Sequence, residues 1–326
     1  MLAKAIGKND GVEVKEVFLQ NSKNSVSVIS YGAITKDWRV YHDGKEIPIL
    51  LGFDSLSAYQ NDKNFIGIIA GRVANRIEFG RFKLNDVGYQ LTLNDYPNHL
   101  HGGHLGFGKR NWDLDIDRKQ CSVRLRRVSP HMEEGYPGEV TVNITITLSE
   151  DSLTYEMLAK PDRPTPINLA QHNYYNLLGK GNIWSHRFES SATRFTPVDK
   201  NLIPNGDIAN LKDISDGFAS VSRENGKPTV HDLDPQKNGI DINLVLDEVK
   251  RGDKGVAKMY AENGLALEIF TGELGLQFYT GSNLFSDSAG HCGKKYLPFS
   301  GFCLEPQNYP SSLTIPSFPN IIYTPD

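Results

Sequence analysis

Apolar and polar residues alternate along much of the chain, which is the pattern of half-buried β-strands. The clearest example is residues 138–160, where Val140, Val142 and Ile144 begin a row of apolar positions on one side of the predicted strand. Residues 149–152 then interrupt the alternation with two serines, a glutamate and an aspartate. A polar interruption between two alternating runs predicts a β-hairpin.

Two further segments have the same organisation. Residues 81–93 contain a predicted turn at Asn85-Asp86, and residues 258–270 contain one at Asn263-Gly264. Asn-Gly favours a tight hairpin because both residues tolerate a positive φ angle. Additional strands are predicted at 24–33, 46–53, 122–128, 241–247 and 274–282.

Helical periodicity is scarce, and only residues 56–65 predict a short helix. Residues 201–237 are rich in Asn, Asp, Gly and Pro and predict a long surface loop, the kind of segment that often borders a binding site. Many short strands separated by turn residues predict an all-β fold, a large antiparallel β-sandwich with few short helices. No linker, repeat or low-complexity segment divides the chain, so we expect a single domain over residues 1–326.

Composition narrows the function classes. The chain has 326 residues, 39% hydrophobic content and a net charge of −4, which suits a well-packed globular protein. Its charges are interspersed, so neither nucleic acid nor a membrane surface is an expected partner. No apolar segment has the roughly 18 residues of a transmembrane helix. Three widely spaced cysteines without CxxC spacing read as free thiols, so we expect a reducing, cytoplasmic location.

Three histidines lie close together in NHLHGGHLGFGKRNWD, residues 98–113, at His99, His101 and His104. Imidazole groups at such spacing are able to bind zinc or iron. A metal site would also need a carboxylate nearby, and residues 105–111 contain none. The alternative is that three surface histidines occupy a glycine-rich loop, and we expect no metal.

Another candidate histidine, His172, lies among amide and phenol side chains in TPINLAQHNYYNLLG, residues 165–179. Amides and phenols offer hydrogen-bond donors and acceptors to a hydroxyl-rich ligand. The same pattern also fits a core histidine whose nitrogens are bonded to its amide neighbours. The residues alone leave both interpretations open.

Two charged segments are further candidates. GRVANRIEFG, residues 71–80, contains Arg72 and Arg76, which fit either ligand contacts or surface salt bridges. FCLEPQNYP, residues 302–310, places Glu305 at the end of an apolar strand. A carboxylate buried there would have a raised pKa, as a general base near neutral pH requires, although an edge-strand glutamate is the common alternative.

The order and wording of several segments resemble the aldose 1-epimerases, also called galactose mutarotases. The resemblance runs from about residue 24 to about residue 320 and is carried by GRVANRI, NHLHGGHLGFGKRNW, PINLAQHNYYNL, TPVDKNLIPNGDI, NGIDINLVLD, LGLQFYTGS and FCLEPQNYP. It implies the supersandwich fold of that family. It also implies an isomerase that interconverts the α and β anomers of a free aldohexose, such as galactose or glucose, without a cofactor or metal.

The resemblance also implies roles for individual residues. Glu305 matches the general base and His172 the general acid. Sugar-contacting positions match Asn75, Arg76, His101, Asp241 and Gln277. In this interpretation His101 is the functional histidine of the cluster, whereas His99 and His104 fill variable positions. For the acid–base pair we expect activity to fall at low pH through the glutamate and at high pH through the histidine.

Three alternatives stay open at this point. A hexose-6-phosphate epimerase would need extra cations, for which Lys109 and Arg110 are candidates. A non-catalytic sugar-binding domain would have lost the glutamate or the histidine. A glycoside hydrolase would use two carboxylates, such as Asp241 and Glu305. The expected partner is a monosaccharide, and the expected assembly is a monomer or a homodimer.

Overall fold

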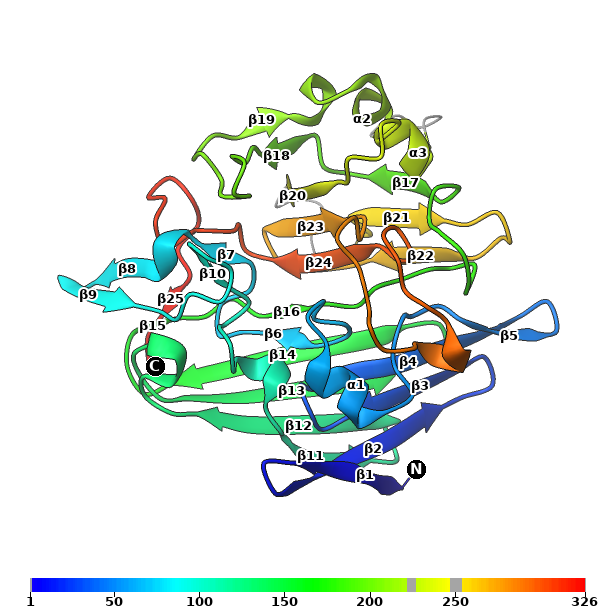
Figure 1. Cartoon of the computed structure of the whole chain (residues 1–326), viewed down its shortest axis with the longest axis horizontal. Coiled ribbons are helices and arrows are strands. Elements are labelled where there is room, and N and C mark those ends of the chain that lie inside the picture. The colour runs from blue at the N-terminus through cyan, green and yellow to red at the C-terminus, as the bar shows by residue number, and fades with distance from the viewer. Residues whose placement is uncertain (1, 222–226, 247–253, 326) are drawn as a thin grey trace.

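The computed structural model describes residues 2–221, 227–246 and 254–325, and within them the fold is built almost entirely of strands (Figure 1). All pairings between named strands in these ranges are antiparallel. The described helices are short: α1 (Leu56–Asn61), α2 (Asp216–Ser220) and α3 (Val230–Leu233), with 3₁₀ turns at Glu78–Gly80, Phe107–Lys109, Glu133–Gly135, Leu211–Asp213 and His291–Gly293. None of the described helices is both long and apolar enough to cross a membrane.

Two sheets lie in the lower half of Figure 1. The first follows chain order and consists of β1 (Ala3–Asn9), β2 (Val12–Gln20), β3 (Asn24–Ile29), β4 (Ile34–His42) and β5 (Lys45–Pro48). The second consists of β11 (Asp113–Asp117), β12 (Ser122–Ser129), β13 (Val140–Leu148) and β14 (Leu153–Pro161), again in chain order. Consecutive antiparallel neighbours need only short turns, which is what the alternating sequence pattern predicts.

Two more sheets lie in the upper half of Figure 1. One has the spatial order β19 (Ala209–Asn210), β18 (Arg194–Thr196), β20 (Asp241–Val245), β23 (Gly275–Tyr279) and β24 (Cys303–Gln307). The other has the order β17 (Arg187–Ser190), β21 (Ala257–Tyr260) and β22 (Ala266–Ile269). Short two-stranded ladders complete the fold: β6 (Ile69–Ala70) with β16 (Ala170–Gln171), β7 (Arg76–Ile77) with β10 (His99–Leu100), β8 (Arg81–Leu84) with β9 (Val87–Gln90), and β15 (Thr165–Pro166) with β25 (Ile322–Tyr323).

One hydrophobic cluster takes side chains from all four larger sheets. Its members include Val28 of β3, Ile144 of β13, Phe188 of β17 and Phe278 of β23. Phe188 and Phe278 stack with their ring centroids 4.5 Å apart. Burial of apolar surface between the sheets is therefore what holds them together. The single domain expected over residues 1–326 stays a prediction.

The hairpins expected from the alternation are confirmed. Residues 138–160 form β13 and β14, and every second side chain of β13 is buried. The turns at Asn85-Asp86 and Asn263-Gly264 join β8 to β9 and β21 to β22, and Gly264 has the expected positive φ of 89°. The strand predicted at 122–128 is present in full as β12, and the other four are present in shortened form as β3, β5, β20 and β23, with residue 247 outside the described ranges.

Two predictions about non-strand segments were wrong in extent. The helix predicted at 56–65 ends at Asn61. The described part of 201–237 is not a plain surface loop, because it contains β19, α2 and α3 and buries Phe218 and Val230. Thr229 and Asp232 form a capping box at the start of α3. Some of the polar residues that predicted a loop therefore cap a helix instead.

Arg72 does not form a surface salt bridge, contrary to the alternative considered from the sequence. Its side chain is buried and donates hydrogen bonds to the Ser129 backbone and hydroxyl oxygens at 3.0 and 2.9 Å and to the carbonyl oxygens of Pro130 and Pro137, both at 2.8 Å. The guanidinium group therefore ties the start of the GRVANR segment to the end of β12 and to the segment that precedes β13.

Replacing Arg72 with methionine should lower the free energy of unfolding by about 3 kcal/mol, because several buried acceptors would lose their donor together. Urea denaturation followed by fluorescence measures this change. Arg124→Met is the matched control, since Arg124 is an exposed residue of β12. Equal denaturation midpoints for the two variants would contradict the structural role of Arg72.

Candidate active site

Antiparallel register gathers several candidate residues on one face of a sheet. Glu305 of β24 lies opposite Gln277 of β23, which lies opposite Asn243 of β20. Asp241 is two residues before Asn243, so its side chain leaves the same face of the strand. Three segments that are far apart in the sequence therefore present adjacent polar side chains.

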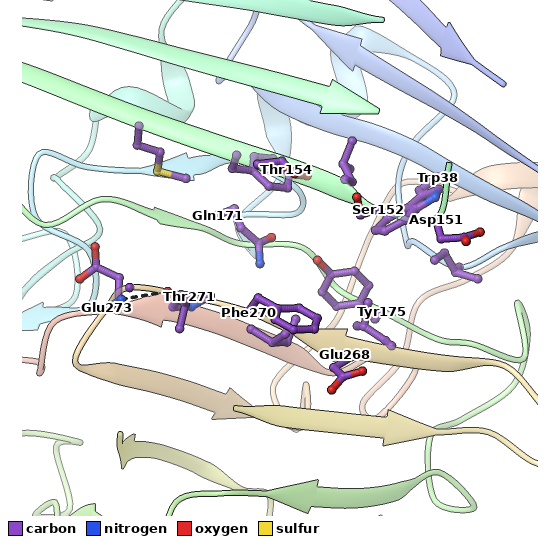
Figure 2. Close-up of a pocket in the computed structure, with 18 of the residues that line it drawn as sticks. Trp38, Asp151, Ser152, Thr154, Gln171, Tyr175, Glu268, Phe270, Thr271 and Glu273 are labelled. Carbon is purple, nitrogen blue, oxygen red and sulfur yellow. Dashed lines mark hydrogen bonds between the residues drawn. The ribbon is translucent and has the colours of Figure 1, made fainter. Parts of the chain in front are cut away.

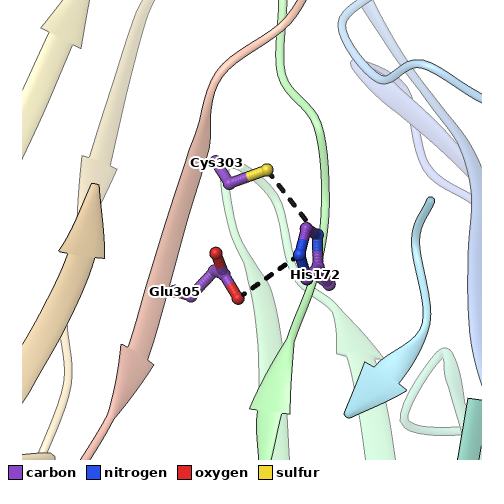
Figure 3. A group of neighbouring side chains, drawn as sticks. All are labelled: His172, Cys303 and Glu305. Atoms are coloured by element: carbon purple, nitrogen blue, oxygen red, sulfur yellow. Dashed lines mark hydrogen bonds and ion pairs between the residues drawn. The ribbon is translucent and has the colours of Figure 1, made fainter. Parts of the chain in front are cut away.

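His172 reaches this face from the segment that follows β16. Its backbone is fixed on both sides, because its N–H donates to the carbonyl oxygen of Ile68 at 2.8 Å and its carbonyl oxygen accepts from the N–H of Gly67 at 2.9 Å. The imidazole Nε2 lies 3.8 Å from Oε2 of Glu305 (Figure 3). The structure thus brings together the two residues that match the acid and base positions of the resemblance.

Burial dominates the electrostatics of this pair. Glu305 is 2% exposed and His172 is 4% exposed. Burial raises the pKa of Glu305 well above its ordinary value, and the negative charge of Asp241 raises it further. Burial lowers the pKa of His172 to about 4. Oε2 of Glu305 is buried and has no hydrogen-bond partner among the described residues, so the protein leaves its hydrogen-bonding capacity unused.

Arg76 lies between two carboxylates at the more open side of the site. Its Nε donates to Oδ2 of Asp95 at 2.8 Å, and its Nη1 lies 4.0 Å from Oδ2 of Asp241. Nε2 of Gln277 donates to the other oxygen of Asp241 at 2.5 Å. Burial raises the pKa of Asp241, an effect that Arg76 and this hydrogen bond oppose. The predicted residues Arg76, Asp241 and Gln277 therefore form one connected group.

Asn75 and His101 hold each other in left-handed backbone conformations, with φ angles of 64° and 49°. The His101 N–H donates to the Asn75 carbonyl oxygen at 3.1 Å, and the Asn75 N–H donates to Nδ1 of His101 at 3.2 Å. Burial lowers the pKa of His101 well below its ordinary value. A neutral His101 that accepts at Nδ1 must carry its proton on Nε2, which makes Nε2 a hydrogen-bond donor.

The other two histidines of the cluster have different environments. His99 is fully buried, with Nδ1 2.7 Å from the Thr92 carbonyl oxygen and Nε2 2.7 Å from the Tyr136 hydroxyl. The expectation of three surface histidines is therefore wrong for His99 and His101, and right only for His104, which is exposed. A buried histidine with both nitrogens paired to protein is a structural residue.

A group with metal-ligand chemistry does occur, but at a different place. Among the described residues it consists of His172, Cys303 and Glu305. Nδ1 of His172 faces Sγ of Cys303 at 3.7 Å, whereas Nε2 faces Glu305 (Figure 3). The thiol and the carboxylate therefore face different nitrogens of one ring, although one ring nitrogen, the sulfur and a carboxylate oxygen all lie within 4.8 Å of one another. Because each ring nitrogen has its own neighbour, the arrangement also suits proton transfer through the imidazole.

Sequence reasoning missed several contacts of the site. Asp95 holds Arg76 and lies in the segment just before β10, four residues ahead of His99. Phe65 packs against His101 with ring centroids 4.8 Å apart, and Tyr174 packs against His172 at 5.1 Å. Cys303 was identifiable in principle, because it is two residues before Glu305 and shares its face of the strand.

A cavity of about 1110 Å³ lies on the opposite face of the same strands (Figure 2). It runs between β14 and β22, and we call it the β14–β22 groove. Gln171, Tyr175 and Pro306 line the groove. His172 follows Gln171 and Glu305 precedes Pro306 in the sequence, and neither His172 nor Glu305 lines the groove. The candidate active site and the groove are therefore separate features on two sides of one layer.

The chain is similar to known proteins over nearly its whole length. A family model described as aldose 1-epimerase matches residues 15–326. The galactose mutarotase of Mus musculus is 38% identical over 318 residues, which cover 97% of this chain and 91% of that protein. The aldose 1-epimerase of Escherichia coli (strain K12) is 29% identical over 317 residues, covering 95% and 90% respectively.

Solved structures agree with this similarity. An aldose epimerase homologue from C. elegans superposes with a TM-score of 0.88 at 26% identity, covering 96% of this chain and 95% of that one. A galactose 1-epimerase from Lactobacillus acidophilus NCFM superposes with a TM-score of 0.84 at 25% identity, covering 99% and 94%. The predicted fold class is thereby confirmed, and the chain belongs to the aldose 1-epimerase family.

Proposed function

We propose that the protein is an aldose 1-epimerase, an isomerase that interconverts the α and β anomers of a free aldohexose such as galactose or glucose. The observation that carries this proposal is the buried pair of Glu305 and His172, with Nε2 and Oε2 3.8 Å apart and Oε2 unpartnered among the described residues. The names of the related proteins, galactose mutarotase and aldose 1-epimerase, support the same reaction.

The reaction needs two proton transfers. Glu305 removes the proton of the C1 hydroxyl, while His172 delivers a proton to the ring oxygen and the bond between C1 and that oxygen breaks. The resulting aldehyde rotates about the C1–C2 bond. In ring closure the two residues work in reverse: His172 takes back the hydroxyl proton and Glu305 returns its proton to the carbonyl oxygen. The atoms and protons balance over the full cycle.

One proton shared by the pair serves both halves of this cycle. Ring opening starts with ionised Glu305 and protonated His172, and ring closure starts with protonated Glu305 and neutral His172. Burial raises the pKa of Glu305 and lowers that of His172, so in the free protein it favours the second, uncharged arrangement. Hydroxyl groups of a bound sugar would stabilise the charged arrangement by donating to the carboxylate.

The remaining predicted residues suit a hydroxyl-rich neutral ligand. Asp241 and Gln277 offer acceptors and donors to hydroxyl groups, and Nε2 of neutral His101 is a donor. The charge of Arg76 is already countered by Asp95 and Asp241. We therefore assign Asn75, Arg76, His101, Asp241 and Gln277 to sugar binding, as the resemblance implies.

A phosphorylated sugar is a poorer fit to the cations nearby in sequence. Nζ of Lys109 donates to the carbonyl oxygens of Tyr59 and Asp62 at 3.2 and 2.6 Å. Nε of Arg110 donates to the carbonyl oxygen of Leu105 at 3.0 Å and lies 3.4 Å from Glu133. Both cations have protein partners, so the proposed substrate is the free sugar. The three free thiols fit the reducing, cytoplasmic location that we retain as part of the proposal.

Polarimetry of freshly dissolved anomers tests the proposed function. The protein should accelerate the optical change of α-D-galactose or α-D-glucose at catalytic concentration, and should act poorly on glucose 6-phosphate. Acceleration of the phosphate ester alone would favour the hexose-6-phosphate epimerase. Sugar binding without any acceleration would favour a non-catalytic binding domain.

Removing either member of the pair should abolish most of the activity. Glu305→Gln keeps the shape of the side chain but cannot accept a proton, and His172→Asn cannot deliver one, so each should lower kcat about 100-fold or more. The double variant should lose much less than the product of the two single losses, because the residues act in one step. Polarimetric kcat values measure both effects.

Matched controls for these variants come from residues of the same type outside the site. Glu268→Gln changes a carboxylate that lines the β14–β22 groove, and His104→Asn changes the exposed histidine of the cluster. Both control variants should have the kcat of the wild type. If Glu305→Gln binds sugar and turns over normally, Glu305 is not the base, and Asp241 is the next carboxylate to change.

The pH dependence of kcat/KM should be bell-shaped, with the active form carrying one proton on the pair. Below about pH 4, His172 gains a second proton and no base is left. At high pH the single proton is lost, and the raised pKa of Glu305 moves this limb above the ordinary range of a carboxyl group. Burial therefore assigns the acid limb of the profile to His172 and the alkaline limb to Glu305, which is the reverse of the assignment that the residue types alone suggest. An alkaline limb in the ordinary carboxyl range would contradict this account.

Arg76→Lys should lower kcat/KM about 10- to 100-fold, because lysine keeps the charge but loses the planar fork that bonds Asp95 and faces Asp241. The effect should include a higher KM, since Arg76 is assigned to sugar binding. Arg81→Lys is the control, because Arg81 is exposed and donates to Gln90. Identical kinetics in the two variants would remove Arg76 from the site.

A further inference from the structure

We propose that Cys303 is a positioning residue for the acid–base pair. Its sulfur accepts a hydrogen bond from Nδ1–H of His172, which leaves Nε2 as the nitrogen that exchanges protons with the sugar. This inference rests on the proposed function and adds a third member to the pair of Glu305 and His172.

The geometry places the sulfur where such a contact is made. Sγ of Cys303 lies 3.7 Å from Nδ1 of His172, whereas Glu305 faces Nε2 of the same ring (Figure 3). Cys303 has no exposed surface. Cys303 and Glu305 are alternate residues of β24, so one strand presents both groups to one imidazole ring.

Neighbouring rings restrict the orientation of the imidazole. The ring centroids of His101 and Tyr174 each lie 5.1 Å from that of His172, and Phe65 lies at 6.2 Å. These contacts limit tilting of the ring but do not decide which nitrogen carries the proton. A hydrogen-bond partner at Nδ1 does decide it, as for other functional histidines.

The catalytic cycle requires that Nδ1 keeps its proton throughout. When protonated His172 gives its Nε2 proton to the ring oxygen, the neutral imidazole that remains carries its hydrogen on Nδ1. Nε2 is then free to take the proton back during ring closure. If Nδ1 lost its proton instead, Nε2 would stay protonated and could not act as the base in closure.

A thiol suits this position because sulfur is a weak, uncharged acceptor. A carboxylate at the same place would fix the tautomer but would also stabilise the imidazolium strongly. Burial raises the pKa of Cys303 well above its ordinary value, so the group stays an uncharged thiol. Cys303 therefore selects the nitrogen without holding His172 in one charge state.

Three substitutions test the role. Cys303→Val conserves shape but removes the acceptor, and should lower kcat about three- to tenfold, the effect of one modest hydrogen bond, with KM changed less than about twofold. Cys303→Ser keeps a neutral acceptor and should recover part of this loss. Cys292→Ser is the control, because Cys292 is an exposed cysteine, and it should match the wild type.

A spectroscopic measurement reads the tautomer directly and does not depend on activity. In ¹⁵N NMR spectra of histidine-labelled protein, neutral His172 should show a protonated Nδ1 in the wild type and a larger share of protonated Nε2 in Cys303→Val. The His172→Asn spectrum assigns the signals. Normal kcat in folded Cys303→Val, or a wild-type His172 protonated on Nε2, would overturn the proposal.

Other failures remain distinguishable. If Cys303→Val does not fold, the wild-type tautomer and the kcat of Cys303→Ser still decide the question. If the wild type does not accelerate anomer interconversion, the proposed function fails, while a protonated Nδ1 that shifts in the variants would still support the contact between Cys303 and His172.

Discussion

Glu305 and His172 lie side by side where water solvates neither charge, and this constraint governs the rest of the site. An isolated buried charge costs several kcal/mol, so a buried carboxyl and a buried imidazole are most stable when they share one proton. The pair is held by backbone structure, because Glu305 lies within a ladder of three strands and His172 is bonded at its backbone N–H and carbonyl oxygen. A rigid pair with one mobile proton is suited to a reaction that runs equally in both directions.

The surroundings keep the site close to electrically balanced. Arg76 is flanked by Asp95 and Asp241, and burial keeps His101 neutral. A neutral ligand rich in hydroxyl groups matches such a site better than an anion, because it brings donors and acceptors without adding charge. The β14–β22 groove lies behind this layer and takes none of these residues, so its size is no guide to the catalytic face. The buried carboxylate of Glu305 and the volume of the groove indicate different places for a ligand. The buried carboxylate without a hydrogen-bond partner is the more specific sign of an active site.

Much of the fold follows from the sequence, since the alternation in residues 138–160 sets the hairpin by itself. The loop predicted at 201–237 was partly wrong because the same polar residues that break strands also cap short helices. At the site, the resemblance supplied the roles, and strand register explains why such distant residues meet. The burial of His99 could not be predicted, because one of its two partners, Tyr136, comes from a distant part of the chain. Asp95 was missed because it acts through another side chain, Arg76, whereas Cys303 was identifiable only from its alternation with Glu305 on one strand.

The most direct measurement is a crystal structure of the Glu305→Gln variant with galactose bound at a saturating concentration. The account predicts that the sugar lies on the face formed by β20, β23 and β24. Its C1 hydroxyl should be within hydrogen-bond distance of residue 305, and its ring oxygen within the same distance of Nε2 of His172. Galactose bound in the β14–β22 groove, or bound at the site with C1 turned away from both residues, would contradict the central claim that this pair opens and closes the sugar ring.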